Sequence, residues 1–122
     1  MVLFDDPLVR QIDRRNHKIN HIDLLKIDVE GGEMDVLLGF KSYLKNKQIS
    51  LIQFEYGYIN ITTKVLLSDY YEFFEGLGYA IGKIYPKYVD FRAYSFKHED
   101  FIGPNFMAVD KEKHDLIDLL KK

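Results

Sequence analysis

The sequence predicts an α/β fold, in which a mainly parallel sheet is built from strand–helix–strand units and finished by antiparallel strands. Three observations lead to this prediction. Residues 22–29 alternate with the period of two that a β-strand requires, and after a double glycine the apolar residues fall at helical spacing. A second strand pattern follows at 49–56. The strand patterns at 79–85 and 88–96 have no helix between them, which predicts the antiparallel ending.

The first strand–helix–strand unit covers residues 22–56. Its strand, at 22–29, leads through the double glycine into a helix at about 33–46, whose last turns are rich in lysine, as suits the helix dipole. The strand at 49–56 follows after a short link. Because such crossover connections join parallel strands, we expect the two strands to be neighbours.

The rest of the chain is predicted to alternate in the same way and then to lose its helices. Residues 57–63 are expected to form a loop, and an apolar stripe predicts a helix that begins near 65 or 68 and ends at 77. The remaining predicted elements are strands at 79–85, 88–96 and 105–109 and a short helix at 115–121.

We expect a single domain over residues 1–122, because the chain shows no internal repeat and no low-complexity linker. Residues 1–21 are basic and are expected to form a solvated N-terminal arm or a surface helix that opens near Pro7. The core is expected at 22–110 and a C-terminal helix within 111–122.

Composition narrows the classes of partner. The chain is 47% hydrophobic and 30% charged, which favours a folded protein. Its formal net charge is -2 and no basic face stands out, which argues against nucleic acid as the main partner. The absence of cysteine excludes disulfides and zinc–thiolate sites. No run is long enough to cross a membrane and the N-terminus lacks a signal-peptide pattern, so a cytoplasmic location without membrane partners is expected.

Four carboxylates lie where the first two predicted strands end: Asp28, Glu30, Glu33 and Glu55. In open α/β sheets, ligands bind outside the carboxyl ends of the strands. Carboxylates that converge there can bind a hard cation, act as a general base or hold a hydroxyl-bearing ligand. A structural role competes for each of them, because acidic residues suit turns and helix N-termini. Lys26, in an otherwise apolar strand, is a candidate ion-pair partner for Asp28 or Glu55.

The double glycine, Gly31-Gly32, does not belong to a nucleotide-binding motif. The chain has neither the Gly-x-Gly-x-x-Gly dinucleotide fingerprint nor a phosphate-binding loop that ends in Gly-Lys-Ser or Gly-Lys-Thr. A sharp strand-to-helix turn with unusual dihedral angles accounts for both glycines.

Residues 22–33, Ile-Asp-Leu-Leu-Lys-Ile-Asp-Val-Glu-Gly-Gly-Glu, with Val-Leu-Leu-Gly at 36–39, closely resemble the signature of FkbM-family methyltransferases. That signature reads approximately Ile-Asp-Leu-Leu-Lys-Ile-Asp-Val-Glu-Gly-Ala-Glu followed by Val-Leu-Lys-Gly-Ala. Residues 52–56, 77–79 and 105–109 are similar to later parts of the family pattern, so the resemblance extends over about 22–110. Gly32 and Phe40 stand where the family usually has alanine.

The resemblance implies a Rossmann-like, class I fold that uses S-adenosylmethionine to methylate a hydroxyl, often on a sugar or a natural-product scaffold. It implies a small-molecule acceptor as partner. Asp28, Glu30 and Glu55 become the candidate catalytic residues, which would orient the acceptor hydroxyl, and Asp28 and Gly31 the candidate cofactor-binding residues. No metal site is expected in this interpretation, although Mg²⁺ is possible.

A larger departure from the family is that the glycine-rich donor loop and the acidic second strand are not in this chain. It resembles the C-terminal half of the catalytic domain. We therefore expect an exposed apolar edge on 22–29, and self-association or association with an N-terminal half. Two alternatives stay open: a hydrolase whose Asp28, Glu30 and Glu55 hold Mg²⁺, and a non-catalytic interaction module.

Overall fold

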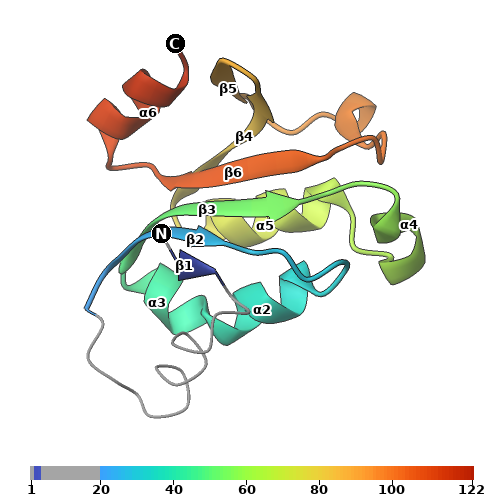
Figure 1. Cartoon of the computed structure of the whole chain (residues 1–122), viewed down its shortest axis with the longest axis horizontal. Helices are drawn as coiled ribbons and strands as arrows, with labels where there is room; N and C mark the ends of the chain where they lie inside the picture. The colour runs from blue at the N-terminus through green and yellow to red at the C-terminus, as the bar shows by residue number, and fades with distance from the viewer. Residues whose placement is uncertain (1, 4–19) are drawn as a thin grey trace.

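A computed structural model of the chain describes residues 2–3 and 20–122 (Figure 1). Within these residues a six-stranded sheet consists of β1 (Val2–Leu3), β2 (Ile22–Lys26), β3 (Ile49–Glu55), β4 (Tyr79–Tyr85), β5 (Tyr88–Phe91) and β6 (Asn105–Asp110). The helices are α2 (Glu33–Gly39), α3 (Lys41–Lys45), α4 (Ile59–Thr63), α5 (Leu67–Gly76), the 3-10 turn Phe96–His98 and α6 (His114–Leu120). The predicted α/β class is confirmed. None of the helices in this part of the chain is long and apolar enough to cross a membrane.

The sheet has the order β1-β2-β3-β6-β4-β5. β1, β2 and β3 are parallel, whereas the pairings of β3 with β6, β6 with β4 and β4 with β5 are antiparallel. The prediction of a mainly parallel sheet was therefore wrong. The reason is that β6 lies between β3 and β4, so that these two strands are not direct neighbours. Both β3 and β4 pair antiparallel with β6.

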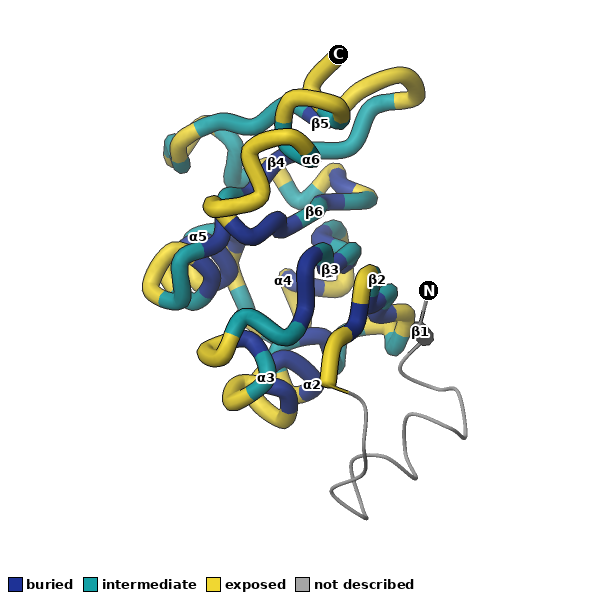
Figure 2. Tube along the Cα trace, turned by 90° about the vertical axis from the view of Figure 1, so that its left-hand side faces the viewer, coloured by how far each residue is buried: buried dark blue, intermediate teal, exposed yellow. Residues whose placement is uncertain are grey.

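The helices α2, α3 and α5 lie on one side of the sheet (Figure 2). They share one apolar core with the buried faces of β2, β3 and β6. Phe54 of β3 is at its centre, with ring centroids 4.7 Å from Tyr70 and 5.3 Å from Phe74 in α5 and 6.0 Å from Phe106 in β6. Burial of these large rings supplies much of the free energy that holds α5 on the sheet.

Several helices and strands begin or end at other residues than the sequence predicted. β2 ends at Lys26 rather than at residue 29, and β5 ends at Phe91 rather than at residue 96. The single helix expected at 33–46 is two helices with a break at Phe40, next to a glycine of low helix propensity. The segment 57–63 was wrongly predicted as a loop and contains α4. The strand predicted at 79–85 is confirmed as β4.

The edge of β2 is partly covered. Val2 and Leu3, which belong to the predicted N-terminal arm, pair with Leu25 and Lys26 as β1. The apolar edge expected on 22–29 is therefore protected at these two positions, because a parallel strand satisfies backbone groups that would otherwise be free. The helix predicted to open near Pro7 lies outside the described residues.

Candidate active site at the carboxyl ends of β2 and β3

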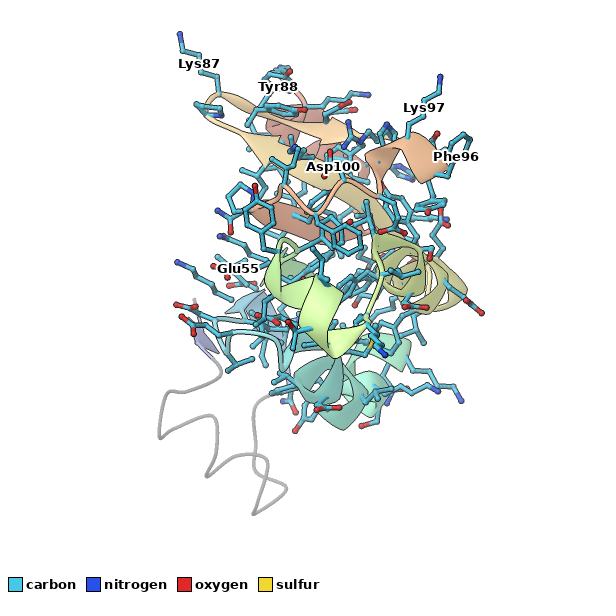
Figure 3. The ribbon with its side chains drawn as sticks, turned by 90° about the vertical axis from the view of Figure 1, so that its right-hand side faces the viewer. Glu55, Lys87, Tyr88, Phe96, Lys97 and Asp100 are labelled. Atoms are coloured by element: carbon cyan, nitrogen blue, oxygen red, sulfur yellow. The ribbon has the colours of Figure 1, made fainter. Side chains whose placement is uncertain are left out.

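The acidic residues predicted from the sequence come together at one edge of the sheet. β2 and β3 are parallel neighbours, with Lys26 opposite Gln53, so both strands end at this edge. Glu55 is the last residue of β3. Asp28 and Glu30 lie in the loop that follows β2, rather than in the strand itself, and both are exposed. Figure 3 shows this edge with Glu55 labelled.

The carboxyl of Glu55 has a raised pKa at this edge. Burial is the largest cause that raises the pKa of its carboxyl above the usual range. The negative charges of Asp28, Glu33 and Glu30 raise that pKa further. A carboxylate with a raised pKa binds a proton more readily at neutral pH, so Glu55 is better suited than an ordinary glutamate to accept a proton from a ligand.

The turn that carries Glu30 has an unusual backbone. Glu30 has φ of 30° and Gly31 has φ of 94°, and the Gly32 N–H donates to the Val29 carbonyl at 3.1 Å. Positive φ is sterically unfavourable for glutamate, because its Cβ approaches the backbone. Strain of this kind persists only where the surroundings enforce it, and it is common at functional sites.

The buried side chain of Glu33 is hydrogen-bonded to this turn. Its carboxylate accepts a hydrogen bond from the Gly31 N–H at 2.9 Å, and the residue is 1% exposed at the first position of α2. Its other oxygen, Oε2, is buried without a hydrogen-bond partner among the described residues. The charge of Glu33 also acts on Tyr70 in α5. The pKa of Tyr70 is raised to about 12, mainly by burial, and the charge of Glu33 adds to this increase. Glu33 therefore supports the loop that presents Glu30.

Side chains of α4 fill the space beside Gly31. A Cβ at this position would lie 3.0 Å from side-chain atoms of Ile59 and Thr63 in α4. Its N–H already donates to Glu33. These contacts explain the glycine through turn geometry and the close approach of α4, and its predicted contact with a cofactor stays a prediction.

The ion pair predicted for Lys26 does not form with any described residue. Lys26 is half-buried, and its charge lowers the pKa of Glu55 without direct contact. Lys26 is the last residue of β2 and is held in the strand, whereas the candidate partner Asp28 is exposed in the loop beyond it.

The sequence analysis missed Glu99, which organises the same edge from the loop at 92–104. Its carboxylate accepts hydrogen bonds from the Leu67 and Ser68 N–H groups of α5, at 2.6 and 3.0 Å, and from the hydroxyls of Tyr56 and Tyr94, at 2.9 and 2.8 Å. Burial favours a higher pKa for Glu99, but these hydrogen bonds outweigh burial and hold the pKa below its usual value. No local pattern could have revealed this residue, because its partners are at least thirty positions away except for Tyr94.

A comparison with protein families identifies the chain. The family model described as the methyltransferase FkbM domain matches residues 7–81, which is more than half of the sequence and includes the four acids predicted from it. The chain belongs to the FkbM methyltransferase domain family. The predicted resemblance is thereby confirmed, and methyl transfer is the class of activity that this family indicates. No curated protein and no solved structure matches the chain.

The described residues of this FkbM domain do not form an evident metal site. Within 2–3 and 20–122, no group of three or more His, Cys, Asp or Glu side chains is arranged to hold a metal ion. The alternative of a Mg²⁺-dependent hydrolase therefore gains no support from the geometry of the four acids.

Proposed function

We propose that this chain is the acceptor side of an S-adenosylmethionine-dependent O-methyltransferase, with the Rossmann-like class I arrangement expected for its family. One observation carries the proposal: in an FkbM domain, Asp28, Glu30 and Glu55 meet where two parallel strands end, and the pKa of Glu55 is raised there. This is where open α/β sheets bind their ligands.

The residues suit the chemistry of methyl transfer to a hydroxyl. S-adenosylmethionine supplies an electrophilic methyl group on a positively charged sulfur, and its transfer to a hydroxyl releases one proton. Glu55 is proposed to accept that proton. Glu30, on its enforced turn, is proposed to orient the acceptor hydroxyl by accepting its hydrogen bond. The exposed carboxylate of Asp28 is proposed to attract the positive charge of the donor.

The first experiment is a calorimetric titration of the purified chain with S-adenosylmethionine, with the mass in solution measured in the same samples. Saturable binding that Asp28→Asn weakens supports the proposal. Asp23→Asn is the matched control, because Asp23 lies at the opposite end of β2 and is exposed. A folded chain that binds no donor, as a monomer or an oligomer, contradicts donor-dependent catalysis by this chain and favours the interaction module.

The electrostatic part of the proposal has its own test. Asp28→Asn removes one of the charges that raise the pKa of Glu55, so this pKa is expected to fall. Carbon-detected NMR of the glutamate carboxyls over a pH titration measures the change. An unchanged pKa in the variant would mean that the two carboxylates do not share a site.

A further inference from the structure

One buried polar side chain, that of Asn60, holds helix α4 in place. Asn60 is 1% exposed, although the isoleucines on either side of it are exposed. Its Oδ1 accepts a hydrogen bond from the Gly57 N–H at 3.0 Å, and its Nδ2 donates to the Val65 carbonyl at 2.9 Å. Gly57 precedes α4 and Val65 follows it, so this side chain binds the backbone on both sides of the helix. A helix of five residues is not stable by itself, and the position of α4 therefore depends on such contacts.

The Asn60 side chain also acts on α5. Burial is the main cause that raises the pKa of the Tyr70 hydroxyl to about 12, and a hydrogen bond with the Asn60 side chain opposes this increase. Tyr70 belongs to α5, is 1% exposed and has its ring centroid 4.7 Å from that of Phe54 in β3. The amide of Asn60 thus has partners on the link after β3, on the backbone after α4 and on α5. A side chain without both a donor and an acceptor would leave some of these buried groups unpaired.

Helix α4 in turn contacts both segments that carry the acids of the candidate site. On one side, a short link joins it to Glu55 at the end of β3, as Figure 1 shows. On the other side, a Cβ at Gly31 would lie 3.0 Å from side-chain atoms of Ile59 and Thr63, which are one helical turn apart on the same face of α4. This face packs against the turn in which Glu30 has φ of 30°. Contacts of α4 are therefore among the surroundings that enforce this turn.

We propose that Asn60 is a positioning residue of the candidate active site, which fixes Glu30 relative to Glu55 by holding α4 against the turn and the strand end that carry them. This inference rests on the proposed function, because it assigns Asn60 to the reaction that Glu30 and Glu55 are proposed to perform. Asn60 is buried and binds groups of the protein itself, so its effect on the site passes through α4. Methyl transfer needs the acceptor hydroxyl in line with the methyl group, and a displacement of about 1 Å in an active site can lower the rate about 100-fold.

The test compares folded variants by NMR, without donor and without turnover. Asn60→Ala removes the acceptor of the Gly57 N–H, so that amide should exchange with solvent about tenfold faster. The Gly31 N–H keeps its own acceptor, Glu33, but should also exchange faster, because α4 no longer packs firmly on its turn. The pKa of the Glu55 carboxyl should fall, because water reaches this carboxyl and the other acids move away from it. A residue that stabilised only α4 would change the Gly57 amide alone.

A pair of isoleucine variants tests whether α4 transmits the effect. Ile59→Ala keeps the buried amide side chain but removes contacts with Gly31, so the amide of this glycine should exchange faster and the Glu55 pKa should fall. The Gly57 amide should stay protected, because its acceptor is unchanged. Ile61→Ala is the matched control on the same helix, because Ile61 is 59% exposed and lies about 200° around the helix from Ile59. It should change none of the three readouts.

Two further variants keep the test independent of overall stability. Lys47→Met removes the ion pair of the buried Asp110 at the amino end of β3 and should leave all three readouts unchanged. If Asn60→Ala does not fold, Asn60→Asp replaces it, because the isosteric carboxylate still accepts from the Gly57 N–H but repels the carbonyl that follows α4. In this variant the Gly31 amide should exchange faster while the Gly57 amide stays protected.

Three results would overturn the inference. They are a folded Asn60 variant in which the Gly31 amide exchanges as in wild type, an unchanged Glu55 pKa in folded Asn60→Ala, and a control variant that changes both readouts as much as the test variants do. The test is separable from that of the proposed function. If S-adenosylmethionine does not bind but the Asn60 variants alter the readouts, only methyl transfer fails. If the donor binds while the variants alter neither readout, only the role of Asn60 fails.

Discussion

Replacement of Glu99 is the sharpest test of how the edge around the candidate site is held. Glu99→Ala removes one carboxylate that four donors share: two N–H groups in the first turn of α5 and the hydroxyls of Tyr56 and Tyr94. Loss of a helix-capping acceptor costs about 1 kcal/mol. The hydrogen bond from the buried Tyr56 to a charged acceptor contributes about 1.5 kcal/mol, and that from the half-buried Tyr94 contributes less. We therefore expect the free energy of unfolding to fall by about 3 kcal/mol.

The measurement is urea unfolding followed by circular dichroism at pH 7, with the exposed Glu72→Ala in α5 as control. The control should change the free energy of unfolding by no more than about 0.5 kcal/mol. A loss below about 1 kcal/mol for Glu99→Ala would refute the argument, because the four contacts would then be as strong with water as with the carboxylate.

The pH dependence gives the same prediction a second test. The folded-state pKa of Glu99 lies below the usual value of 4.5, so its contribution is fully present above that pH and is lost as pH falls through the folded pKa. The difference in unfolding free energy between wild type and Glu99→Gln should therefore shrink as the pH is lowered from 7 to about 3. A difference that stays constant over this range would show that the charge of Glu99 is not involved.

Three further substitutions test other parts of the structure. Lys47→Met leaves the carboxylate of Asp110, which is 2% exposed, without the ammonium group 3.5 Å away, and should lower the free energy of unfolding by about 3 kcal/mol in urea denaturation. Gly31→Ala places a Cβ against Ile59 at a φ of 94° and should cost about 2 kcal/mol, with displaced α4 resonances by NMR. Glu30→Gly relieves the φ of 30° and should raise the melting temperature, so a less stable variant would contradict the strain. In an assay of the proposed methyl transfer the same variant should be inactive, and activity equal to wild type would contradict the role proposed for Glu30.

Local patterns in the sequence determined the first strand–helix–strand unit. The alternation at 22–26, the double glycine and the short link to β3 are all properties of neighbouring residues, and they correctly placed Asp28, Glu30 and Glu55 at one edge. The pattern of that same stretch also revealed the family.

Tertiary structure alone decided the remaining features of the site. The position of β6 between β3 and β4 depends on pairing between strands far apart in the chain, for which the sequence contains no local signal. In α4 the polar Asn60 is buried, because its side chain binds the backbone at both ends of the helix, while Ile59 and Ile61 are exposed, so apolar periodicity could not predict this helix. Glu99 has its role because a loop crosses to the start of α5, and such contacts are fixed only once the core has packed.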